Sequence, residues 1–160
     1  KVAKSIRRDV ATVEELEYYL KVWQQARYKD YNVLYIATHG TPDRIQLGRT
    51  EMGLDELGEI LEGSCQGRVV YLGGCQILNF GDEELMTFVK KIRAKSVVGY
   101  WKDVDWLGSA AFELLLLTEL AHSIRTPDLF RRLVNEHPVV AKRLGLVVAT
   151  ASEVFTAEGD

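Results

Sequence analysis

Cysteine and proline are scarce in this sequence, whose 160 residues include two cysteines and three prolines. Cys65 and Cys75 are too few for a disulfide framework, and they do not form a Cys-x-x-Cys pair. We therefore expect reduced thiols and a cytoplasmic protein. No apolar run is long enough to span a membrane and no signal-peptide-like stretch is present, so we expect no membrane partner.

Positive charge is not in excess either. The 20 Lys and Arg residues are outnumbered by 23 Asp and Glu residues, which gives a net charge of -3. Proteins that bind nucleic acids usually present a basic face, so we expect no nucleic acid partner. Zinc-ligand spacing, a G-x-G-x-x-G motif and a P-loop are all missing. We therefore expect no metal and no cofactor.

The sequence does have enough apolar residues, at 47%, to build the core of a single domain over residues 1–160. Apolar runs typical of doubly buried strands alternate with segments of helical periodicity. This alternation predicts an α/β fold, a three-layer α-β-α sandwich with a mostly parallel sheet. The expected strands are residues 32–38, 68–72, 96–101 and 144–150, with a short strand or hairpin at 44–49. The expected helices are residues 12–27, 53–62, 82–92 and 107–123, and one that opens at Thr126.

Two expected strands end in residues with reactive side chains. His39 follows the strand at 32–38, and Cys75 follows the strand at 68–72. Functional groups gather at the carboxyl ends of parallel strands, so neighbouring strands would bring the two side chains together. A thiol beside an imidazole is the arrangement that nucleophilic thiol catalysis needs. We therefore predict that Cys75 is the nucleophile and His39 the general base.

Glycines flank both residues. Gly40 leaves room for a substrate, and its N–H and that of Cys75 are the expected donors to an oxyanion. Gly73 and Gly74 are expected to let the backbone turn sharply at the nucleophile, which makes Gly74 part of the same backbone site.

The segments 35–40 (YIATHG) and 71–76 (YLGGCQ) resemble caspase-like cysteine peptidases, the clan of caspases, metacaspases, separases and CHAT domains. In that clan a hydrophobic strand ends in His-Gly, and the next core strand ends in a small residue and the catalytic Cys. Residues 96–106 (SVVGYWKDVDW) are similar to the third strand and Trp-x-x-x-Asp turn of CHAT and separase domains. The likeness is closest to bacterial CHAT-like domains and extends over about residues 30–120. It implies a caspase-like fold, cysteine endopeptidase activity on a protein or peptide substrate, and a sensor or partner protein.

The same resemblance indicates substrate-binding residues. Separase-like enzymes have an acidic residue in the turn after the third strand, a place that Asp103 or Asp105 fills. A carboxylate there would favour a basic P1 residue, Arg over Lys. Trp101 is a candidate for lining the substrate cleft and Gln76 for the wall of the P1 pocket.

Two other functions stay open at this point. One is a catalytically inactive caspase-like interaction or adaptor module. The other is a flavodoxin-like, ligand-binding α/β domain, which would hold a phosphate at the strand ends instead of a Cys–His pair.

Overall fold

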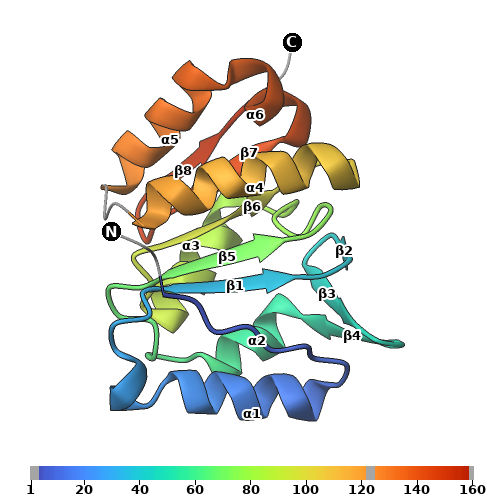
Figure 1. The fold of residues 1–160 in the computed structure, drawn as a ribbon, viewed down its shortest axis with the longest axis vertical. Helices are drawn as coiled ribbons and strands as arrows, with labels where there is room; N and C mark the ends of the chain where they lie inside the picture. The colour runs from blue at the N-terminus through green and yellow to red at the C-terminus, as the bar shows by residue number, and fades with distance from the viewer. Residues whose placement is uncertain (1–3, 122–124, 159–160) are drawn as a thin grey trace.

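The protein is an α/β protein, described by a computed structural model for residues 4–121 and 125–158 (Figure 1). The described residues form a mixed five-stranded sheet, a small antiparallel three-stranded sheet and six α-helices. The strand order in the large sheet is β1-β5-β6-β7-β8. Its strands are β1 (Val33–Ala37), β5 (Val69–Gly73), β6 (Ser96–Tyr100), β7 (Leu146–Ala149) and β8 (Val154–Thr156). The small sheet consists of β2 (Gly40–Thr41), β3 (Arg44–Leu47) and β4 (Thr50–Gly53).

Helices cover both faces of the large sheet. In Figure 1, α4, α5 and α6 lie at the top and α1 and α2 at the bottom. Three helices pack on one face of the sheet and share a hydrophobic core with it: α1 (Val13–Trp23), α2 (Leu54–Ile60) and α3 (Asp82–Ile92). A short 3-10 helix, Ala26–Tyr28, follows α1. The helices that pack on the opposite face are α4 (Trp106–Ala121), α5 (Thr126–Glu136) and α6 (Pro138–Leu144). Residues 122 and 123 of the helix expected at 107–123 lie outside the described residues.

The central strands are largely apolar because each contributes side chains to both cores. Along β5, Val70 and Leu72 point into the core of α1–α3, whereas Val69 and Tyr71 point into the core of α4–α6. All five residues of β6 are buried in the same way. The near-continuous apolar runs in the sequence are therefore the strands of a sheet that is covered on both sides.

The expectation of a mostly parallel sheet was wrong for its second half. The pairs β1–β5 and β5–β6 are parallel, but β6–β7 and β7–β8 are antiparallel. One helix connects β5 to β6, as parallel crossovers require. In the described part of the connection from β6 to β7 there are three helices, and a short turn joins β7 to β8, so neither connection imposes a parallel direction.

The tail was also predicted incorrectly. The sequence predicts that the tail after Phe155 frays, but β8 pairs with β7, the Phe130 and Phe155 rings lie 5.5 Å apart, and Ala157 is buried. Residues 159 and 160 lie outside the described residues. The His137-Pro138 pair predicts that the helix opened by Thr126 stops there or that the chain bends, and α5 does end at Glu136. Pro138 then opens α6, a position that proline tolerates because its missing N–H has no helical partner there.

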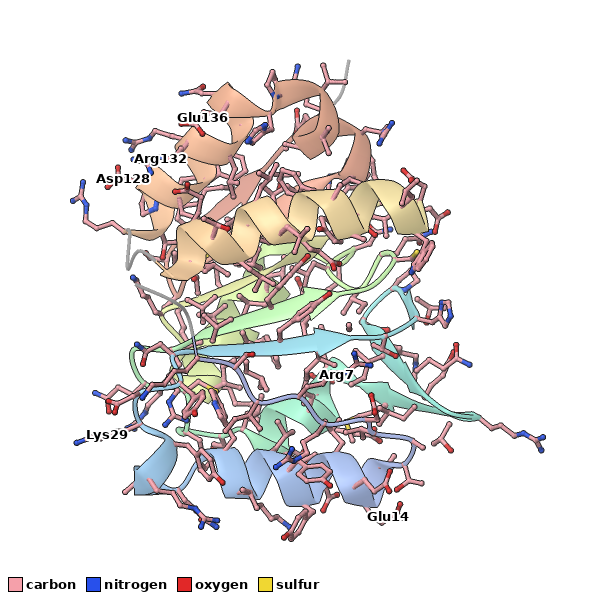
Figure 2. The ribbon with its side chains drawn as sticks, viewed as in Figure 1. Arg7, Glu14, Lys29, Asp128, Arg132 and Glu136 are labelled. Carbon is pink, nitrogen blue, oxygen red and sulfur yellow. The ribbon has the colours of Figure 1, made fainter. Side chains whose placement is uncertain are left out.

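The outer surface carries the charges. In Figure 2, five labelled charged side chains lie near the outline of the molecule, namely Glu14, Lys29, Asp128, Arg132 and Glu136. Arg7, labelled over the middle of the view, is exposed as well. Large apolar side chains are exposed as well, and most of them belong to α4, where Trp106 is 84% and Leu107 74% exposed. Among the described residues, no helix combines the length and apolarity needed to cross a membrane.

Candidate active site

His39 and Cys75 follow neighbouring parallel strands at the same edge of the sheet. In the register of β1 with β5, Ala37 lies opposite Gly73, the last residues of the two strands. The pairing continues for one residue, because the Thr38 N–H donates to the Gly73 carbonyl at 3.4 Å. His39 and Cys75 each come two residues after the last register pair. The predicted juxtaposition of these two strand ends is therefore present.

Glycine is required at positions 40 and 74, where the segments after β1 and β5 lie close together. A Cβ atom at Gly40 would collide with the Ile77 side chain and lie 2.7 Å from the Cys75 carbonyl oxygen. A Cβ atom at Gly74 would lie 2.5 Å from the Thr38 carbonyl oxygen. The backbones on either side of the candidate dyad thus approach as closely as only glycine permits.

The sharp turn at the nucleophile has a different origin from the one expected. Neither Gly73 nor Gly74 has a positive φ, whereas Gln76 adopts a left-handed conformation with φ of 54°. The two glycines are needed for space, and the chain reverses one residue after Cys75. The N–H of Gln76 donates to the Lys102 carbonyl at 3.0 Å, which fixes the reversal.

The Cys75 thiol is held by the turn that follows β6. Its Sγ lies 3.5 Å from the Val104 N–H, which donates to it, and 3.6 Å from the Val104 carbonyl, which accepts from it. Cys75 is half-buried, and His39 is exposed. Among the described residues, no hydrogen bond joins the His39 ring to the thiol. The two groups share a sheet edge, but the thiol is engaged elsewhere.

The other predicted substrate-binding residues are connected to the same turn. The Gln76 Nε2 donates to Asp103 Oδ1 at 2.8 Å, which links the two loops beside Cys75. Asp105 accepts from the Gly108 N–H at 2.6 Å at the start of α4, and its carboxylate lies 3.4 Å from Arg143. Asp103 and Asp105 are exposed, and each already has a partner within the chain.

Trp101 lies at the far side of this turn. Its backbone N–H donates to the Gly145 carbonyl at 3.0 Å, and the Lys102 ammonium lies 4.7 Å from the centre of its ring. The indole is packed partly against the core of α1–α3, and its Nε1 is buried without a hydrogen-bond partner. Trp101 therefore connects the turn to α6 and β7.

Sequence reasoning missed a polar pair beside the nucleophile, Tyr35 and Glu113. The Tyr35 hydroxyl donates to Glu113 Oε2 at 2.6 Å. A side chain at Gly73 would begin 2.6 Å from the Tyr35 ring and 3.2 Å from Glu113 Oε1. Burial and the Glu113 carboxylate raise the pKa of Tyr35 far above its usual range, so its hydroxyl remains a donor. The absence of a side chain at Gly73 was the one signal in the sequence, since it leaves room for this pair.

The second cysteine is not part of the site. Cys65 is fully buried in the core of α1–α3, and burial raises the pKa of its thiol to about 11. A thiol of that pKa is almost entirely protonated near neutral pH and reacts slowly.

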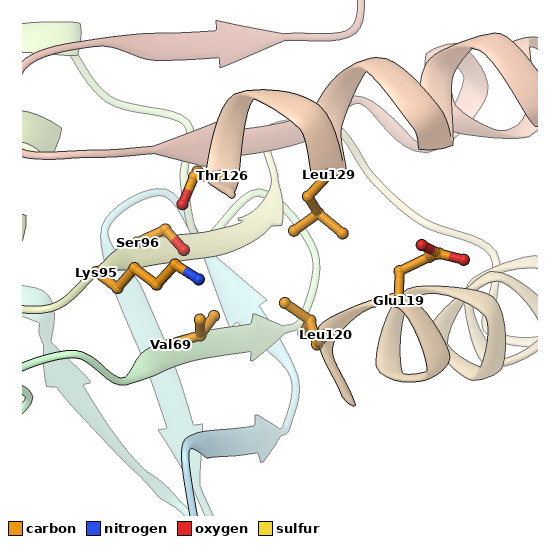
Figure 3. A pocket seen from close by; sticks show the side chains of 7 residues that line it. All are labelled: Val69, Lys95, Ser96, Glu119, Leu120, Thr126 and Leu129. Atoms are coloured by element: carbon orange, nitrogen blue, oxygen red, sulfur yellow. The ribbon is translucent and has the colours of Figure 1, made fainter. Parts of the chain in front are cut away.

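A small cavity lies at the opposite end of the sheet (Figure 3). It has a volume of about 20 Å³ and lies between the starts of β5 and β6, where the Ser96 hydroxyl is buried without a partner. No group of three or more His, Cys, Asp or Glu side chains in the described part of the chain could hold a metal ion.

The fold and the site together define an α/β protein with a histidine and a cysteine at the carboxyl ends of two adjacent parallel strands. Within that class, the chain belongs to the family of unknown function DUF6642, whose model matches residues 1–148. Neither the curated proteins nor the solved structures include a match to the chain.

Proposed function

We propose that the protein is a cysteine endopeptidase in which His39 activates Cys75. The observation that carries this proposal is the register of β1 with β5, which brings a histidine and a cysteine to one edge of the sheet. The exposure of His39 and the partial exposure of Cys75 fit a site that a peptide must reach. The sequence resemblance to caspase-like peptidases supports the same assignment.

The chemistry follows from the two groups. His39 takes the proton of the Cys75 thiol, and the thiolate attacks the carbonyl carbon of the scissile peptide bond. The imidazolium returns the proton to the amine as the carbon–nitrogen bond breaks, which leaves a thioester. Water, deprotonated by His39, then attacks the thioester and releases the acid and the thiol.

Backbone N–H groups are available for the oxyanion. The N–H groups of Gly74 and Cys75 donate to no backbone carbonyl among the described residues. The Gln46 N–H donates to the His39 carbonyl at 2.9 Å, so the alternation of an antiparallel ladder points the Gly40 N–H away from β3. Preorganised donors of this kind stabilise the negative charge that develops on the carbonyl oxygen.

The first step requires the thiol to leave the turn that holds it. In the structure Sγ bonds to both backbone groups of Val104. A rotation of the Cys75 side chain away from Val104 frees Sγ for the imidazole. The resting protein is thus proposed to be a low-activity form.

The proposal extends to the type of fold, the substrate, the residues that contact it and the cellular compartment. The sheet with helices on both faces would be a three-layer α-β-α sandwich of caspase-like type. The substrate would be a protein or peptide, with Trp101, Gln76, Asp103 and Asp105 near it and a sensor or partner protein as the trigger. The protein would act in the cytoplasm.

The proposal is tested by measuring peptide cleavage and thiol reactivity together. Cys75→Ala is expected to abolish cleavage, and His39→Ala to lower kcat/KM by about 10²- to 10⁴-fold, the usual contribution of a general base. His137→Ala, which removes a histidine that lies between α5 and α6, is the matched control and should leave cleavage unchanged. If Cys75 reacts with iodoacetamide no faster than a model thiol and no peptide is cleaved, the proposal is wrong.

The hold of Val104 on the thiol favours a second candidate, a catalytically inactive adaptor of the same fold. An adaptor would keep its partner when Cys75 is replaced by Ala. A peptidase would keep its partner and lose turnover with the same substitution.

A further inference from the structure

Glu113 lies over the strand that leads to the candidate nucleophile. A side chain at Gly73 would begin 3.2 Å from Glu113 Oε1, so the carboxylate covers the backbone two residues before Cys75. Two residues of chain span at most about 7 Å. The carboxylate therefore lies over the chain segment that leads into Cys75.

The two groups are also on the same side of the sheet. Side chains alternate along β5: Tyr71 points to the α4 side, Leu72 to the other side, and the Cβ direction of Gly73 again faces Glu113 of α4. Cys75 lies beyond the strand, but its Sγ contacts Val104, which packs against the same core of α4–α6 in the turn that leads into α4.

Solvent reaches this side of the sheet at the end of β1. Ala37 lies opposite Gly73 in the register and is exposed, as is His39 two residues further on. By alternation from Tyr35, Ala37 faces the same side as Glu113. Glu113 therefore lies on the side of the sheet that solvent reaches at the end of β1.

Glu113 has a hydrogen bond but no counter-charge. The Tyr35 hydroxyl occupies Oε2 at 2.6 Å and holds the carboxylate in one orientation. The six ion pairs between described residues pair other carboxylates and leave Glu113 out. A half-buried, oriented carboxylate without a cation attracts one from a ligand, and a charge-assisted hydrogen bond is stronger than a neutral one.

We infer that Glu113, oriented by Tyr35 over Gly73, binds the cationic side chain of the peptide residue whose carbonyl Cys75 attacks. The inference rests on the proposed peptidase function for the position of that residue. It assigns the recognition of a guanidinium or ammonium group to a residue of α4, whereas Asp103 is occupied by Gln76 and Asp105 by the start of α4. Glu113 is a specificity-determining residue in this scheme and takes no part in bond breaking.

The first test profiles peptide cleavage. Wild-type protein is expected to cleave after Arg or Lys, with separate Arg and Lys substrates to rank the two cations. Glu113→Gln keeps an acceptor for Tyr35 but removes the charge, and is expected to lower kcat/KM on these substrates about 10- to 100-fold, the size of one charge-assisted hydrogen bond. Its rate of Cys75 alkylation by iodoacetamide, a small neutral probe, should not change.

Two further variants test whether the effect of Glu113→Gln comes from a general loss of negative charge or from a change in the structure. Glu136→Gln removes one negative charge from α5 at the periphery (Figure 2) and should cleave as the wild type does. Glu113→Asp keeps the charge and should retain the preference for cations at a reduced rate, which a purely structural role would not predict. Cleavage only after acidic or apolar residues, with Glu113→Gln as active as wild type, would overturn the inference and leave the peptidase standing.

A binding experiment separates the two proposals. If no peptide is cleaved and Cys75 is unreactive, the peptidase proposal fails, and titrations of Cys75→Ala with butylguanidine and butylamine, followed by NMR, test Glu113 by itself. Affinity that is at least about tenfold weaker when Glu113→Gln is added supports a cation-binding site. Equal affinity in both proteins, or no saturable binding in either, overturns it.

Discussion

The segments after β1 and β5 lie so close together that one added methyl group at Gly40 is expected to lower the free energy of unfolding substantially. In Gly40→Ala the new Cβ would meet the buried Ile77 side chain and lie 2.7 Å from the Cys75 carbonyl oxygen. Overpacking of this kind costs about 1–3 kcal/mol, and contact with backbone rather than a flexible side chain places the cost in the upper part of that range. For a chain of this size, a loss of about 2–3 kcal/mol lowers Tm by roughly 4–12 °C.

Thermal and urea unfolding of the wild type and Gly40→Ala would measure this cost. Gly53→Ala is the control, because a Cβ atom at Gly53 has no neighbour within 4 Å, and its role as the N-cap of α2 limits the loss to about 1 kcal/mol. In an Ile77→Ala background the penalty of Gly40→Ala should shrink but not vanish, since the Cys75 carbonyl remains. A Tm of Gly40→Ala within about 1 °C of the wild type would show that the strand ends do not approach as described.

Three further predictions concern the core and the first helix. Burial raises the pKa of Cys65 from an ordinary value of 9.0 to about 11, so the folded state keeps a proton that the unfolded state releases, and stability present below pH 9 should be lost toward pH 11. Urea unfolding at both ends of that range should show a smaller loss in Cys65→Ala, and an equal loss would contradict the assignment. The buried hydroxyls of Tyr71 and Tyr100 form a hydrogen bond at 2.7 Å. Tyr71→Phe should therefore lower the free energy of unfolding by about 1–3 kcal/mol, because it leaves the Tyr100 hydroxyl without a partner. If the double variant Tyr71→Phe/Tyr100→Phe loses the sum of the two single changes, the pairing is refuted. Thr12→Ala removes the hydroxyl that accepts from the Glu15 N–H at 3.2 Å, and should destabilise the protein by about 1 kcal/mol in the same assay, whereas an unchanged midpoint would mean that this cap contributes nothing.

The elements that place His39 and Cys75 could be predicted because their signals are local. Apolar runs predict β1 and β5. The small residues at the end of each run, followed by His39 or Cys75, indicate where the strand ends. Thr12 followed three residues later by Glu15 is likewise a four-residue signature of a helix start, and the structure contains this capping box.

The missed features depend on long-range packing. Glu113 lies on α4, a helix that is apolar nearly all round, so its sequence gives no indication of which side faces the sheet. The contact of Cys75 with Val104 joins residues from two different strand ends, and β8 is too short for periodicity to distinguish it from a loop. The two strand ends could thus be predicted from the sequence, whereas the hold of the turn on the thiol could not.

The place of β1 in the sheet has a consequence for how the two reactive groups move. Among the described residues, β1 pairs along one side only, with β5, whereas β5 is paired along both sides, with β1 and β6. Strands bonded along one side open locally at lower free energy than central ones, and their amides exchange with solvent faster. The histidine is thus attached to the more easily opened strand and the cysteine to the more persistent one, so fluctuations that change their separation are expected to originate mainly on the His39 side.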